Sequence, residues 1–74
     1  MEYELNGAFI REHAHETIMG VQLEYRFTLV AKAREWAIEN VDKFDSEWAF
    51  IDALVSKVQD IASTERYPLV DDLF

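Results

Sequence analysis

The sequence predicts a small α+β domain in which a β-hairpin is followed by two packed helices, in the order ββαα. The chain has 74 residues, which is the size of one domain. Apolar and polar residues alternate from Val21 to Leu29, and after Ala31 the apolar residues recur at helical steps. We expect a single domain over residues 1–66 and an acidic, apolar C-terminal tail over residues 67–74.

The segment from Val21 to Leu29 carries the strand prediction. The alternation there has no exception, and successive side chains of a strand point to opposite faces. A helix, at about 100° per residue, would instead place Val21, Tyr25 and Leu29 on one side and Leu23 and Phe27 on the other. Because such a helix would have two apolar faces, the strand is preferred.

The other strand of the hairpin is expected within residues 8–17, after a bend or bulge at Gly7. Residues 18–20 would form the turn between the two strands. A hairpin alone is marginal in water, so it needs a helical layer on its apolar face. In the alternative interpretation residues 8–19 form a helix, and the protein is an all-α three-helix bundle.

Two helices are predicted after the hairpin. The first begins near Ala31 and ends near Asn40, and the second covers residues 46–63, with Asp45 or Ser46 as its N-cap. The predicted core of the whole domain contains Phe9 or Ile10, Leu23, Phe27, Trp36, Ala37, Val41, Trp48, Ile51, Leu54, Val55, Val58 and Ile61.

The composition excludes several classes of function. Fifteen acidic residues face seven basic ones, for a net charge of −8, and this charge opposes direct binding to nucleic acid or to an anionic membrane. The absence of cysteine excludes disulfides and thiolate metal sites. It also favours a reducing, cytoplasmic location. No apolar stretch approaches the ~20 residues of a membrane span.

His13 and His15 are the candidate metal ligands. Residues two apart share one face of a strand, so both imidazoles could reach one ion. The run from Gly7 to His15 resembles the opening of the cupin metal motif, in which Gly precedes His-x-His. Met19 and Gly20 stand where that motif has a Glu. No cofactor is expected.

The acidic residues of the two predicted helices are the candidate binding site. Their outward sides would form a negative ridge that fits a basic groove, as in a nucleic-acid mimic. The alternative is an ordinary solvated helical face. The ridge residues are Glu35, Glu39, Asp42, Asp45, Glu47, Asp52 and Asp60.

The C-terminal residues Asp71, Asp72, Leu73 and Phe74 are a second candidate. They resemble short linear motifs that end in Leu-Phe, such as the bacterial sliding-clamp peptide, although Val70 stands where that motif usually has Gln. Two apolar anchors behind two acids can dock in a pocket with a basic rim. In the alternative the tail folds back onto the domain.

These features predict a protein-binding regulator or inhibitor rather than an enzyme. Its partner would be a larger nucleic-acid-handling protein with a basic surface. Small acidic proteins of phages and mobile elements that inhibit host nucleic-acid machinery are similar in size and charge. The alternatives are a structural or accessory subunit that docks through its apolar stripe or tail, and a metal-binding protein. A homodimer is also expected, because hairpin edges and surplus apolar surface invite pairing.

Overall fold

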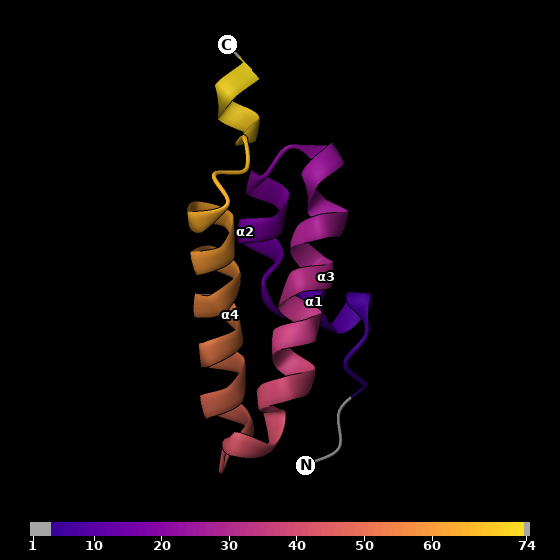
Figure 1. Ribbon diagram of the computed structural model, residues 1–74, viewed down its shortest axis with the longest axis vertical. Helices are drawn as coiled ribbons and strands as arrows, with labels where there is room; N and C mark the ends of the chain where they lie inside the picture. The colour runs from indigo at the N-terminus through magenta and orange to yellow at the C-terminus, as the bar shows by residue number, and fades with distance from the viewer. Residues whose placement is uncertain (1–3, 74) are drawn as a thin grey trace.

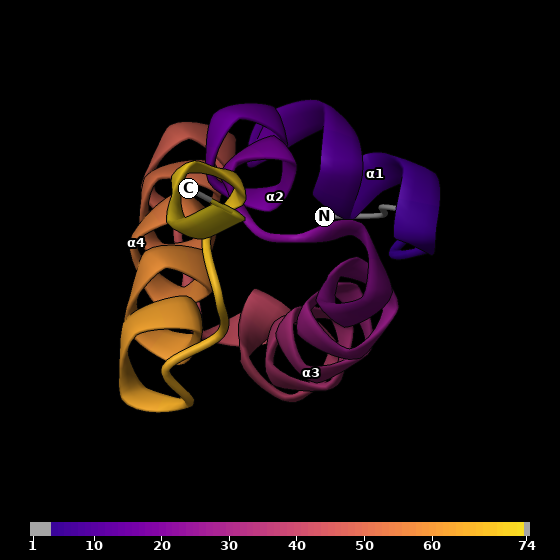
Figure 2. The ribbon, with the colours of Figure 1, turned by 90° about the horizontal axis from the view of Figure 1, so that it is seen from above.

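The computed structural model describes residues 4–73, and the side chains of residues 4–71. It is a bundle of helices, arranged as α1 (Gly7–His13), α2 (His15–Gly20), α3 (Leu23–Asn40) and α4 (Glu47–Thr64). Two short 3-10 helices are η1 (Val41–Lys43) and η2 (Val70–Leu73). Helices α3 and α4 run side by side along the long axis (Figure 1). Seen from above, α3, α4 and the α1–α2 pair form a triangle (Figure 2).

The predicted β-hairpin is wrong, and the all-α alternative fits. Within residues 4–73 no sheet is present, and the one isolated bridge joins Val21 to Leu69. The segment predicted as the second strand lies mostly in the first turns of α3, which begins at Leu23. The helix with two apolar faces is therefore the conformation that the chain adopts. One of the two faces points into the core, and the other points to solvent.

The residues expected in the first strand form α1 and α2. Asn6 is the N-cap of α1, and its side-chain oxygen accepts a hydrogen bond from the Phe9 N–H at 2.9 Å. Ala14 separates the two helices with φ −113° and ψ 31°, and its N–H still donates to the Ile10 carbonyl. Gly7, where a bend or bulge before a strand was expected, is therefore the first residue of a helix.

The core runs along the centre of the bundle. All four helices contribute to it, and its largest fully buried side chains are Phe50, Ile10, Leu29, Leu54, Val21 and Val58. An aromatic cluster fills the end of the bundle near the start of α4. There the Phe50 ring lies 5.7 Å from Phe44, 6.3 Å from Phe9 and 6.4 Å from Trp36, measured between ring centroids. Three residues of the predicted core are wrong, because Leu23, Phe27 and Trp48 are exposed.

Ser46 fixes the start of α4, as predicted. Its side-chain oxygen accepts from the Ala49 N–H at 3.1 Å. We expect Ser46→Ala to lower the free energy of unfolding by about 1 kcal/mol, because one N–H of the first turn loses its partner. Urea unfolding followed by circular dichroism measures this loss. Ser56→Ala, an exposed position inside the same helix, is the matched control and should not lower stability. Equal losses at both positions would contradict the capping role.

The chain after α4 returns to the turn between α2 and α3. Arg66 has φ 55°, and the Tyr67 N–H donates to the Ala62 carbonyl, which ends α4 in a left-handed cap. The Gln22 N–H then donates to the Pro68 carbonyl at 2.9 Å, and the Gln22 side chain donates to the Leu69 carbonyl. Tyr67 also stacks on Tyr25. The first residues of the predicted tail are thus held against the bundle.

Candidate functional site

Helix α3 presents its second apolar face to solvent. Leu23 is 70% exposed and Phe27 is 73% exposed, and the two lie one helical turn apart. Met19, near the end of α2, is also among the exposed large apolar residues. We call Met19, Leu23 and Phe27 the α2–α3 apolar face.

The α2–α3 apolar face borders a cavity of about 420 Å³ between α1, α2 and α3. The cavity is lined by Arg11, His15, Ile18, Met19, Leu23, Arg26 and Phe27. A second hollow of about 470 Å³, between the start of α3 and η2, is lined by Gln22, Leu23, Glu24, Arg26 and Val70. Leu23 and Arg26 line both hollows, so Leu23 stands between two concave surfaces.

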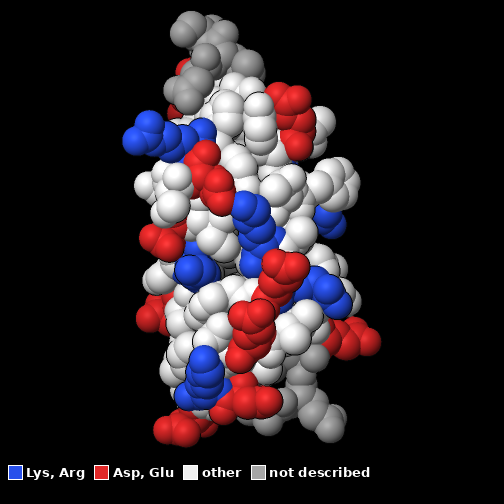
Figure 3. Space-filling view, viewed as in Figure 1, with Lys and Arg blue, Asp and Glu red and all other residues white. Residues whose placement is uncertain are grey.

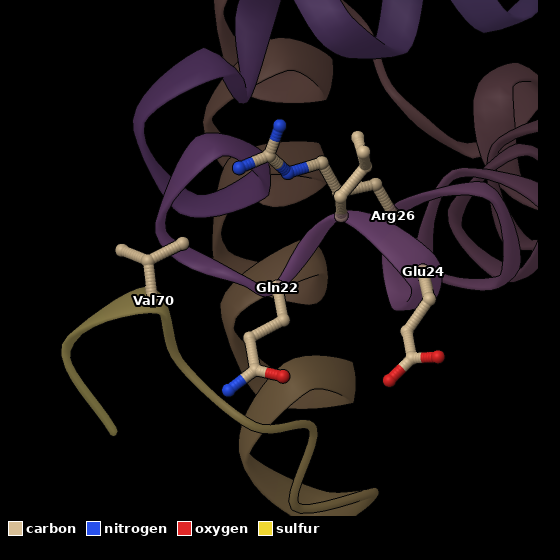
Figure 4. A pocket seen from close by; sticks show the side chains of 5 residues that line it. Gln22, Glu24, Arg26 and Val70 are labelled. Carbon is tan, nitrogen blue, oxygen red and sulfur yellow. The ribbon is translucent and has the colours of Figure 1, made fainter. Parts of the chain in front are cut away.

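Two arginines from different helices lie at the margin of this face. The Arg11 guanidinium carbon is 5.5 Å from the centroid of the Phe27 ring, which is the range of a cation–π contact. Arg26 is half-buried, and its Nε donates to the Val21 carbonyl at 2.8 Å. Its terminal nitrogen donates to the Met19 carbonyl at 3.0 Å. Figure 4 shows the Arg26 side chain pointing toward α2, away from Gln22 and Glu24.

Arg26 therefore has a structural role as well as a surface one. The last carbonyl groups of a helix have no partner within that helix. The guanidinium of Arg26 accepts no bonds and supplies donors in a fixed geometry, so it satisfies two carbonyls where α2 ends. This contact fixes the start of α3 against α2, and with it the position of Leu23.

Trp48 is a separate exposed aromatic residue. It is 82% exposed near the start of α4, and it lines a hollow of about 300 Å³ with His13, Glu47 and Ile51. No arginine or lysine lines that hollow. Trp48 is thus a second exposed apolar site, and unlike the α2–α3 apolar face it has no basic residue in the lining of its hollow.

The predicted ridge residues are all on the surface. Glu35 and Glu39 lie one turn apart on α3, and Asp42 follows in η1. On α4 Asp60 lies 3.6 Å from Lys57, and Asp52 is exposed nearer its start. Figure 3 shows Lys and Arg side chains interspersed with Asp and Glu on the visible face, with a short row of acidic side chains in its lower half. The exposed members of the predicted ridge are Glu35, Glu39, Asp42, Asp45, Glu47, Asp52 and Asp60.

The predicted tail site is described only in part. Asp71 is exposed, and η2 includes the backbone of Asp72 and Leu73. The side chains of Asp72 and Leu73, and all of Phe74, lie outside the described residues. The tail as a docking motif stays a prediction.

His13 and His15 do not share the strand face on which the metal prediction depended. His13 ends α1 and its ring packs 4.5 Å from the Phe9 ring, while His15 begins α2 and is exposed. Both line one shallow hollow with Glu12 and Glu16. Among the side chains of residues 4–71, no three of His, Asp or Glu form a group that could hold a metal ion.

One ion pair links the two long helices. Lys32 of α3 lies 2.5 Å from the Glu65 carboxylate, just after α4, and both side chains are partly exposed. The hydrogen bond to Glu65 raises the pKa of Lys32 above its usual value of 10.5. The stabilisation from this pair is therefore complete below pH 10.5 and is lost as the pH rises through the higher pKa of the folded state. Exposure to solvent keeps it small.

No protein-family model, curated protein or solved structure matches this chain. None of the helices described for residues 4–73 combines the length and the apolar character needed to cross a membrane. The candidate site must therefore be interpreted from its own residues. The α2–α3 apolar face was not predicted from the sequence, because Leu23 and Phe27 are expected there in the core. The signal that could have found it is the second helical stripe formed by those same two residues.

Proposed function

We propose that this protein is a small helical module that binds another protein through the α2–α3 apolar face. The observation that carries the proposal is the exposure of Leu23 and Phe27 on one face of α3. Exposed apolar patches with a polar rim mark interaction sites in small domains. Aromatic residues, Met and Arg are also enriched at protein interfaces, and Phe27, Met19 and two arginines lie together here.

The packing of α3 supports this role. Leu29, Val30, Ala33 and Ala37 are the buried residues of α3, so the helix packs on the bundle through side chains other than Leu23 and Phe27. Removing both from water in a complex would contribute about 25 cal/mol for each Å² buried. The two residues are therefore better placed to stabilise a complex than to stabilise the isolated domain.

A second candidate function is the binding of a basic surface on a larger nucleic-acid-handling protein, as a regulator or inhibitor. The supporting observation is the exposed acidic group of Glu35, Glu39 and Asp42 at one end of α3 and in η1. Carboxylates spaced along a helix complement Lys and Arg clusters. The interspersed basic side chains of Figure 3 weaken this candidate relative to the first.

Photo-crosslinking in the cells that make the protein tests the first candidate. A photoreactive phenylalanine analogue at position 27 should give one discrete adduct with a partner, because the ring faces outward. Leu23→Asp in the same chain should abolish that adduct, since a charge would enter the apolar contact. The control position is Ser56, which is exposed on α4.

Three outcomes separate the candidates. Loss of the adduct with Leu23→Asp, and its retention with Glu39→Lys combined with Asp42→Lys, supports the apolar face. Loss of the adduct with Glu39→Lys combined with Asp42→Lys, but not with Leu23→Asp, supports the basic-surface candidate. Adducts that form equally at positions 27 and 56, or that ignore Leu23→Asp, would contradict binding through the α2–α3 apolar face.

A further inference from the structure

Positive charge borders the one apolar face for which we propose a partner, although the protein as a whole is strongly acidic. The Arg11 guanidinium lies over the Phe27 ring, and Arg26 lines the same cavity as Leu23 and Met19. The chain has seven basic residues against fifteen acidic ones. Among the described residues, the lining of this cavity thus includes two arginines and no carboxylate, while Glu24 lines the neighbouring hollow with Leu23 and Arg26.

Neither arginine has a carboxylate partner within the described part of the chain. The ion pairs there are Lys32 with Glu65 and Lys57 with Asp60. Arg26 uses its Nε and one terminal nitrogen on backbone carbonyls. The other N–H donors of Arg26 stay available. The Arg11 guanidinium lies over the Phe27 ring.

From this juxtaposition we infer that the partner segment is an acidic amphipathic helix, with carboxylates flanking its apolar side chains. This inference rests on the proposed function. The apolar side chains would contact Leu23 and Phe27 and enter the hollows beside Leu23. The flanking carboxylates would accept hydrogen bonds from Arg11 and Arg26, which is the planar, charge-assisted geometry that guanidinium groups favour.

The negative net charge of the protein determines how salt should change its affinity for an acidic segment. A charge of −8 repels an acidic segment at long range. At physiological salt this repulsion is screened beyond about 8 Å, while the contacts at Arg11 and Arg26 persist at short range. Added salt should therefore leave the affinity of an acidic helix unchanged or improve it. A basic segment attracted by the overall charge should lose affinity steeply.

The test uses two synthetic amphipathic helical peptides with the same leucine face. One carries glutamates on its polar face and the other carries lysines. Titrated into the isotope-labelled protein at physiological salt, the glutamate peptide should shift the amide signals around Met19, Leu23 and Phe27. Arg11→Gln should weaken its binding about tenfold, the equivalent of one charge-assisted contact. Arg66→Gln, the same change of charge at an exposed position after α4, should have no effect.

The outcomes distinguish this inference from the proposed function. If the lysine peptide alone binds at the same face, and Arg11→Gln strengthens it, the acidic partner is contradicted while apolar docking stands. If neither peptide shifts the signals of the face, both are contradicted. Binding of the glutamate peptide that is insensitive to Arg11→Gln, or that occurs elsewhere on the protein, also overturns the inference. Because Arg11 is exposed, the variant should keep the dispersed spectrum of the folded protein.

Discussion

Phe50→Ala should lower the free energy of unfolding by about 3–5 kcal/mol. The ring of Phe50 is fully buried at the centre of the aromatic cluster, with Phe9, Trp36 and Phe44 around it. Its removal forfeits the apolar transfer energy of the ring and leaves a cavity that three rigid neighbours cannot easily close. Small domains have about 5–15 kcal/mol of stability in total, so the variant should be close to unfolding.

Phe27→Ala is the matched control, because it removes the same atoms from an exposed site. With Phe27 at 73% exposure, its truncation should change stability by no more than about 0.5 kcal/mol. Urea unfolding of the two variants and of the unchanged protein, followed by far-ultraviolet circular dichroism, measures the difference. Similar losses for both would mean that Phe27 is buried in the isolated domain, and that the apolar face is part of the core.

The C-terminal half of the fold could be predicted from the sequence. The helix expected over residues 46–63 is α4, and Ser46 caps it as expected. Leu54, Val58 and Ile61 are buried as predicted. This agreement has a physical cause, because α4 has a single apolar stripe at helical spacing and a side-chain cap at its start. The prediction fails for Trp48, which belongs to the same helix and is exposed.

The N-terminal half could not be predicted in the same way. The alternation from Val21 to Leu29 satisfies a strand, and it equally satisfies a helix with two apolar faces. The strand prediction rests on the assumption that a helix would not leave a second apolar face in solvent. Within α3, Leu29 continues one helical turn at a time to Ala33 and Ala37, which are all buried, while the buried Val21 lies in extended backbone before the helix. This longer periodicity gives α3 a continuous packing face, and the assumption fails at Leu23 and Phe27.

The candidate site could not be predicted because Leu23 and Phe27 are expected in the core, and because the composition does not point to its arginines. Composition draws attention to the acidic residues, since they outnumber the basic ones. The two arginines beside the apolar face come from α1 and α3, and only the packing of these helices brings them together. Nothing in their spacing along the chain indicates that Arg11 stands over Phe27. A surface assembled from three helices is visible only once their packing is known.

The pair Phe27→Glu and Leu29→Glu tests most directly whether α3 is a helix with one apolar face in solvent. In a strand, residues 27 and 29 share a face, so a glutamate at either position would have the same effect. In the helix they point to different sides, with Leu29 fully buried and Phe27 largely exposed. An unpaired carboxylate at position 29 would lie in the core, and its desolvation should cost more than about 4 kcal/mol.

The measurement is the urea unfolding midpoint of the two glutamate variants beside that of the unchanged protein. We expect Phe27→Glu to stay within about 0.5 kcal/mol of the unchanged protein and Leu29→Glu to be largely unfolded in buffer. Equal destabilisation by the two substitutions, or a greater loss with Phe27→Glu, would contradict the outward-facing helix. It would also remove the basis for a binding surface at Leu23 and Phe27.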